Sequence, residues 1–358
     1  MNSKKPLFFL RIFQSVPLQE RINFARHLSI TIKSGLPILE ALRLIKTQAS
    51  SKMLGKIIES IIKDIENGQF LAQALQKYNH IFGDLFINLV KVGETSGNLS
   101  ETLLHLSAEL KKQRAVNQRI HGALIYPAVI LVVTVAITLF LTLFIFPKIL
   151  PIFLGLGIQL PFTTRLVIQF LTFLSRYGLV GFGGVIVFVV AVRLVLSVEK
   201  IHFVFDRALL SVPFISKILT NLTMTSFTRS LSVLLKSGMD IVEALKVAKG
   251  TFHNKYYRGE VEKIVNSVKK GESIARYLAT RPCLFPPMLT GMIQVGESTG
   301  NLEQNLLYLS EYYESEVDEI VKNLTSILEP VLLLFMGLVV GFIALSIITP
   351  IYKITQGY

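Results

Sequence analysis

The sequence FARHLSITIKSGLPILEAL (Phe24–Leu42) returns later in the chain as FTRSLSVLLKSGMDIVEAL (Phe227–Leu245), with 11 of 19 residues identical. The offset between the two stretches is 203 residues. The same offset, without a gap, aligns VGETSGNL at 92–99 with VGESTGNL at 295–302. Landmarks that recur in one order at one spacing indicate that a structural unit has been duplicated.

Within each copy, the residue pattern is helical. Apolar residues with polar flanks lead up to Lys33-Ser34-Gly35, and a glycine commonly follows the C-terminus of a helix. Asn98-x-x-Glu101 and Asn301-x-x-Gln304 each form a capping-box pattern before a long final helix. No alternating strand pattern competes, so we predict an all-α membrane protein with two homologous bundles of about six helices each.

The composition indicates a membrane protein. Hydrophobic residues make up 51% of the 358-residue chain and charged residues only 17%, whereas a soluble domain carries about 25%. About 20 consecutive apolar residues cross the hydrocarbon layer of a bilayer. Three stretches meet this requirement, and we predict transmembrane helices at 122–147, 177–198 and 327–350.

The distribution of basic residues predicts the orientation. The net charge is +13, and residues 1–121 carry 17 basic and 9 acidic side chains. Because Lys and Arg accumulate on the cytoplasmic side, the first copy is expected in the cytoplasm. Residues 199–329 are balanced, with 15 basic and 15 acidic side chains, so the cytoplasmic location of the second copy follows from three spans alone.

These boundaries predict nine consecutive segments. They are an N-terminal arm (1–19), the first cytoplasmic domain (20–121), the first span (122–147), a short external segment (148–176), the second span (177–198), a linker (199–222), the second cytoplasmic domain (223–326), the third span (327–350) and an external tail (351–358).

The repeated G-E-x-x-G sequence is the principal candidate for a functional motif. Its members are Gly93, Glu94, Gly97, Gly296, Glu297 and Gly300. The glycines suit a tight turn or close packing. The acids are candidates either for bonding backbone amides at a helix end or for facing a basic surface of a partner. GESTG also matches the G-x-S-x-G of hydrolases, but a helix–turn–helix context excludes that reading.

Further candidates lie at the membrane. Pro127, Glu329 and Pro330 mark the entry to two spans, and the prolines are expected to kink the helices there. Glu329 is either a solvated interfacial acid or a functional acid inside a helix bundle. Gly337-x-x-x-Gly341 would let another helix approach closely, although glycine is common in transmembrane helices.

No pattern of catalytic residues is evident. The six histidines are dispersed, Cys283 is the single cysteine, and no phosphate-binding G-x-x-x-x-G-K-[ST] occurs. We therefore predict a protein that is not an enzyme and binds no metal or cofactor, with energy for any driven work supplied by a partner. No basic and aromatic stacking surface points to direct nucleic-acid binding. A small membrane transporter remains the competing class.

With these residues in view, the chain resembles the inner-membrane platform proteins of type II secretion and type IV pilus machines, the F-domain family. The resemblance rests on the duplicated domain, K-S-G followed by I-x-E-A-L, V-G-E-x-x-G-N-L in both copies, Tyr126-Pro127 and Glu329-Pro330. Many members have a longer segment before the first copy, so the chain is also similar to the shorter platforms of competence pseudopili, which serve DNA uptake.

The resemblance implies a function and a set of partners. Members of this family sit in the bacterial inner membrane and couple a cytoplasmic hexameric ATPase to the extraction of pilin or pseudopilin subunits. The expected partners are that ATPase, pilin transmembrane helices, other inner-membrane assembly proteins, membrane lipid and further copies of the chain. The G-E-x-x-G residues are landmarks of the family.

Overall fold

The computed structural model describes residues 16–145, 212–252 and 254–355, together with single positions and short stretches between 147 and 210. The chain divides into two compact units. The bundle unit comprises Met1–Gln118 and Phe203–Asp318, and the span unit comprises Arg119–His202 and Glu319–Tyr358. Each unit is described below by itself.

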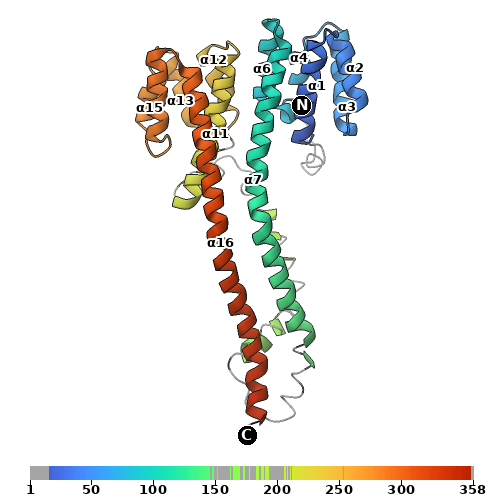
Figure 1. Cartoon of the computed structure of the whole chain (residues 1–358), viewed down its shortest axis with the longest axis vertical. Helices are drawn as coiled ribbons and strands as arrows, with labels where there is room; N and C mark the ends of the chain where they lie inside the picture. Colours follow the sequence, from blue (N-terminus) through green and yellow to red (C-terminus); the bar gives the residue numbers. More distant parts are fainter. Residues whose placement is uncertain are drawn as a thin grey trace, which may run out of the picture. The chain divides into compact units, whose positions relative to one another are not determined.

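The bundle unit contains two helical bundles, drawn in blue to cyan and in yellow to orange in Figure 1. The first bundle consists of α1 (Leu18–Lys33), α2 (Ile38–Gln48), α3 (Lys52–Glu66), α4 (Leu71–Gln76), α5 (Asn79–Phe82), α6 (Asp84–Thr95) and the beginning of α7 (Leu99–Phe140). The second consists of α11 (Pro213–Lys236), α12 (Ile241–Lys249), α13 (Lys255–Val268), α14 (Ile274–Ala279), α15 (Pro287–Thr299) and the beginning of α16 (Leu302–Thr355).

This architecture confirms the predicted all-α fold with two homologous bundles, and the described part of the chain contains no strand. Two details differ from the prediction. The first bundle contains a single extra turn, α5, before Gly83. In the second bundle α11 begins at Pro213, inside the predicted linker, because proline is readily accommodated in the first turn of a helix.

A pair of serines shows that the two bundles are built alike. Ser29 of α1 donates a hydrogen bond from Oγ to the carbonyl oxygen of Ser100 in α7, at 2.6 Å. At the equivalent positions, Ser232 of α11 donates to the carbonyl oxygen of Glu303 in α16, at 3.0 Å. The first and last helices of each bundle are therefore joined at the same point.

Aromatic side chains fill the equivalent centres of both bundles. In the first, Phe82 packs between Phe24 and Phe86, with ring centroids 5.7 and 4.9 Å away. In the second, Phe227 and Phe285 occupy the positions of Phe24 and Phe82 and are fully buried. Burial of such large apolar side chains is the main force that holds bundles of this size together.

Within the residues that the structure describes, two helices are long and apolar enough to cross a membrane. They are Leu99–Ile145, in which α7 continues into a π-helical turn at Leu141–Ile145, and Leu302–Thr349 within α16. Both run through their prolines, Pro127 and Pro330, as continuous helices. Most of the second predicted span (177–198), much of the external segment and most of the N-terminal arm lie outside the described residues.

Candidate functional site at the G-E-x-x-G turns and the junction between the bundles

The carboxylate of Glu94 binds the N-terminus of a neighbouring helix. Its two oxygens accept hydrogen bonds from the backbone N–H groups of Leu71 and Ala72, at 2.6 and 2.8 Å. These residues open α4, whose own preceding residue, Phe70, offers no side-chain cap. Glu94 thus supplies the acceptors that the first N–H groups of a helix otherwise lack.

Glu297 does the same in the second bundle. Its oxygens accept from the backbone N–H of Ile274 at 2.6 Å and of Ala275 at 3.1 Å, and the hydroxyl of Ser273 donates to it at 2.6 Å. Neither Glu297 nor Glu94 forms an ion pair within the part of the chain that the structure describes. Two roles were left open for Glu94 and Glu297: bonding backbone amides at a helix end, or facing a basic surface of a partner. The contacts that both acids make within the chain are of the first kind.

The first glycine of each motif allows two helices to approach closely. A Cβ atom at Gly93 would lie 3.0 Å from the Cα of Leu99, and one at Gly296 would lie 2.9 Å from the Cα of Leu302. These distances are tighter than ordinary contacts of a Cβ atom, so a larger residue at either position would force the end of one helix away from the start of the next.

The last glycine of each motif forms the turn itself. Gly97 and Gly300 have φ angles of 72° and 73°, in the left-handed region that favours glycine. The next helix begins two residues later in each copy, directly after Asn98 or Asn301. The Asn98 side-chain amide donates to the Glu101 carboxylate at 2.6 Å, which joins the two side chains of the predicted capping box.

In the span unit, the predicted membrane-entry residues lie on two helices that contact each other. The hydroxyl of Tyr126 in α7 donates a long hydrogen bond of 3.5 Å to Glu329 in α16. Tyr126 and Glu329 are separated by 203 residues, so they occupy the same position in the repeat. Each directly precedes the proline of its own helix, Pro127 or Pro330.

Gly337 and Gly341 lie beside open space. A Cβ atom at either glycine would meet none of the described atoms within 4 Å. Both glycines line a largely apolar cavity of about 820 Å³ within the span unit, together with Thr138, Thr142 and Phe335. The close approach of another helix at these glycines stays a prediction, since no helix of the described chain makes it.

A buried arginine between the two bundles is a feature that the motifs did not reveal. Arg229 of α11 is 3% exposed and pairs with Glu109 of α7 and Glu314 of α16. The Arg229 Nε and a Glu109 carboxylate oxygen are 3.5 Å apart. Burial raises the pKa of the Glu109 carboxyl to about 7, against the opposing effect of Arg229.

The aligned copies contain a signal for this cluster. Arg229 has an arginine at its equivalent position, Arg26, which is exposed. Its acidic partners, however, are replaced by other residue types in the repeat. The position equivalent to Glu109 is occupied by Tyr312, and the position equivalent to Glu314 by Lys111. The positions equivalent to the two acidic partners carry no acid, so the ion cluster at Arg229 has no counterpart at Arg26.

Two further contacts join the bundles. Lys112 of α7 and Glu311 of α16 form an exposed ion pair with an N–O distance of 3.7 Å. Gly250, which follows α12, lies so close to Asp84 of α6 that a Cβ atom there would be 2.6 Å from the Asp84 carboxylate. The bundle unit is therefore held together by charges and by a close approach of α6 and α12.

The described residues hold no group of three or more His, Cys, Asp or Glu side chains that could bind a metal ion. The fold and these contacts thus define a class of protein: a duplicated helical-bundle protein whose bundles continue into long apolar helices and meet through buried charges.

Comparison with known proteins identifies the family to which this chain belongs. The family model described as "Type II secretion system (T2SS), protein F" matches residues 24–147 and again 227–350. The chain is 33% identical to the type IV pilus assembly protein PilC of Thermus thermophilus, covering 94% of this chain and 83% of the relative. It is 30% identical to the type II secretion system protein F of Pseudomonas aeruginosa, covering 92% and 82%. The chain belongs to the protein F family of type II secretion systems.

Proposed function

We propose that this protein is the non-enzymatic inner-membrane platform of a type IV pilus or type II secretion machine. The observation that carries the proposal is the similarity, over 94% and 92% of this chain, to relatives named for pilus assembly and for type II secretion, with both family domains present. In this role the two bundles couple a cytoplasmic assembly ATPase to the extraction of pilin or pseudopilin subunits from the membrane.

We further propose a multi-pass topology with three spans and a cytoplasmic N-terminus. Direct contacts between Glu109 of the first bundle and Arg229 of the second support it, because residues in contact lie on the same side of a membrane. A chain that leaves the first bundle through α7 must then return through the segment between α7 and α11. The predicted span at 177–198 supplies that return.

The spans are proposed to contact the transmembrane helix of the subunit that is being assembled. The cavity beside Gly337 and Gly341 supports this part of the proposal, because small residues let a second helix come close in a bilayer. Three spans make a thin bundle, so the platform is expected to work as an oligomer surrounded by other inner-membrane assembly proteins.

A deletion strain tests the function. Loss of the chain should abolish surface pili or secretion, and gentle crosslinking of the tagged chain in its native membrane should recover a hexameric ATPase together with pilin-like subunits. Normal assembly in the deletion strain would overturn the proposal. Recovery of the chain alone under efficient crosslinking would remove the coupling role and favour a transporter, which solute flux in liposomes would then test.

A further inference from the structure

One helix face occurs in both bundles and is covered in only one of them. In the second bundle α11 and α12 form this face, and α7 and α6 of the first bundle lie against it. In the first bundle the equivalent face belongs to α1 and α2, and its side chains are exposed. We call it the free face, and it consists of Arg26, Ile30, Lys33 and Leu44.

The exposure of equivalent side chains shows the difference between the two copies. On the covered face, Arg229 of α11 is 3% exposed and Val247 of α12 is 8% exposed. Their counterparts on the free face are Arg26, which is exposed, and Leu44, which is 43% exposed. Ile30 is 48% exposed as well. The free face thus combines apolar side chains with charges at its edge, which is the composition of surfaces that bind another protein.

The junction between the bundles shows what kind of element covers such a face. Glu109 of α7 lies opposite Arg229, with 3.5 Å between a carboxylate oxygen and Nε. The charge of Lys236, further along α11, acts on the carboxylate of Glu101. The two helices therefore run antiparallel, and carboxylates eight residues apart meet cations seven residues apart. At a rise of about 1.5 Å per residue, these two spacings match along the helix axis.

The cations of the free face have no such partners. Arg26 and Lys33 have the same spacing as Arg229 and Lys236. Within the part of the chain that the structure describes, neither Arg26 nor Lys33 forms a hydrogen bond or an ion pair. An acidic helix that approached them would form charge pairs without breaking an existing one.

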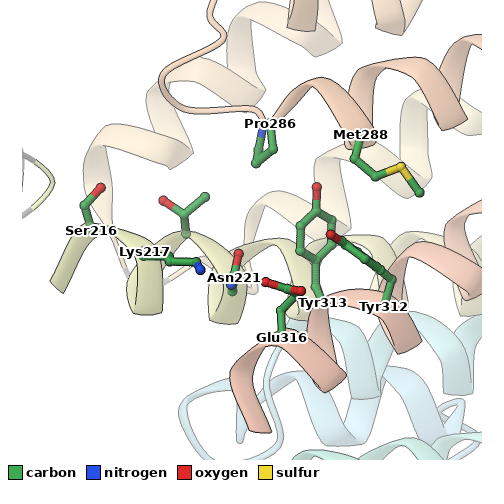
Figure 2. Close-up of a pocket in the computed structure, with 9 residues that line it drawn as sticks. Ser216, Lys217, Asn221, Pro286, Met288, Tyr312, Tyr313 and Glu316 are labelled. Carbon is green, nitrogen blue, oxygen red and sulfur yellow. The ribbon is translucent and has the colours of Figure 1, made fainter. Parts of the chain in front are cut away.

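A second copy of the chain does not supply this acidic helix. Its α15 and α16 are equivalent to α6 and α7, but Gln304 and Tyr312 stand where α7 has its two carboxylates. Tyr312 lines a small pocket together with Pro286 and Met288, as Figure 2 shows. An amide and a phenol ring carry no negative charge, so the charges of the free face favour a different protein as the partner.

We propose that the free face binds an α-helix of a partner protein that carries two carboxylates seven or eight residues apart, with apolar residues between them. One carboxylate pairs with Arg26 and the other with Lys33, while the apolar residues pack on Ile30 and Leu44. The bound helix runs antiparallel to α1, as α7 does on α11. The inference goes beyond the proposed function and rests on it only for the source of the partner, a protein of the assembly machine.

Site-specific photo-crosslinking in native membranes tests the free face. p-Benzoylphenylalanine replaces Ile30 in the full chain, and the control carries it at Lys56, an exposed residue of α3 outside the face. We expect the Ile30 probe to form an adduct with one helical segment of another protein that has acids at the stated spacing, and the Lys56 probe to form none with that segment. An adduct with a second copy of the chain, with lipid only or with a segment that lacks these acids would overturn the proposal, as would no adduct at all.

Reversal of single charges provides the second arm. Arg26→Glu should lower the adduct yield of the Ile30 probe by about tenfold or more, because it places a carboxylate opposite a carboxylate. Lys33→Glu repeats the test at the other cation. Lys56→Glu is the matched control, since it makes the same change of charge at an exposed lysine outside the face, and it should leave the yield within about twofold. Thermal unfolding of the purified variants checks that each keeps its fold.

The result is separable from the platform function. An unchanged adduct yield in both Arg26→Glu and Lys33→Glu sinks the acidic-helix proposal even if the deletion strain lacks pili. Normal pili or secretion in the deletion strain defeats the platform function, whatever is crosslinked at Ile30.

Discussion

At the scale of single residues, the G-E-x-x-G motif joins three helices of its bundle. The Glu297 carboxylate accepts hydrogen bonds from two backbone N–H groups of α14. Gly296 lets α15 and α16 approach each other closely, and Gly300 makes the turn between these two helices. The motif recurs because each copy has to solve this packing problem. Its residues are therefore expected to act first on the stability of the bundle and only through it on assembly.

Glu297→Gln should destabilise the second bundle by about 1–3 kcal/mol, because an amide group replaces one of the acceptor oxygens and leaves a backbone N–H or Ser273 without a partner. Glu272→Gln is the matched control, since Glu272 is an exposed acid on the turn before α14. Thermal unfolding of the purified chain, followed by circular dichroism, measures both. Equal unfolding temperatures for the two variants would show that the capping contact contributes nothing.

At the scale of helices, the junction of α7, α11 and α16 is organised around a charge that cannot easily be removed. Arg229 is the cation of a buried cluster with two carboxylates, Glu109 and Glu314. Removing one member of a buried ionic cluster costs more than the cluster contributes as a whole, because the remaining charges stay buried without compensation.

Arg229→Leu is therefore expected to lower the free energy of unfolding by about 3–5 kcal/mol at neutral pH. Arg26→Leu changes the equivalent, exposed residue and should stay within about 0.5 kcal/mol of the wild type. Denaturant unfolding of the full chain in detergent compares the pair. A similar loss in both variants would mean that the position matters for helix formation and not for the junction between the bundles.

The same cluster predicts a pH dependence. The pKa of Glu109 is about 7 in the folded chain and near 4.3 in an unfolded one, and the groups that face it are Arg229, Lys112 and Glu314. Between these values the folded state holds a proton that the unfolded state has lost. Stability from this group is therefore present at about pH 4–5 and is lost as the pH rises through 7.

Glu109→Gln keeps the shape of the neutral acid and should remove this dependence. Relative to the variant, the wild type is expected to lose up to about 3 kcal/mol between pH 5 and pH 8. Unfolding free energies of both proteins at several pH values provide the comparison. Parallel curves for the two proteins would contradict the assignment of the titration to Glu109.

At the scale of the whole molecule, the contacts between the bundles predict that both bundles lie on the same side of the membrane. The accessibility of one residue can test this prediction. Cys283 is exposed in the second bundle and is the single cysteine of the chain. A membrane-impermeant maleimide should label it in inside-out vesicles and not in intact cells. Labelling from outside would place the second bundle across the membrane from the first and exclude the middle span. Cys283→Ser controls for labelling of other proteins.

Much of the fold could be predicted from local patterns. The 203-residue repeat, the glycine turns and the long apolar stretches depend on residues close in sequence, and the helices of both bundles follow from them. The single turn of α5 and the early start of α11 were not predicted, because packing against neighbouring helices extends structure beyond what a local pattern specifies.

The site was only partly predictable for the same reason. The members of G-E-x-x-G were visible as a repeated motif, but the backbone amides bound by Glu94 lie 22 and 23 residues away. The burial of Arg229, with Arg26 exposed at the same place in the repeat, depends on which surfaces of different helices face one another. Repetition and hydropathy are properties of the chain itself, whereas burial and pairing arise only when distant segments pack together.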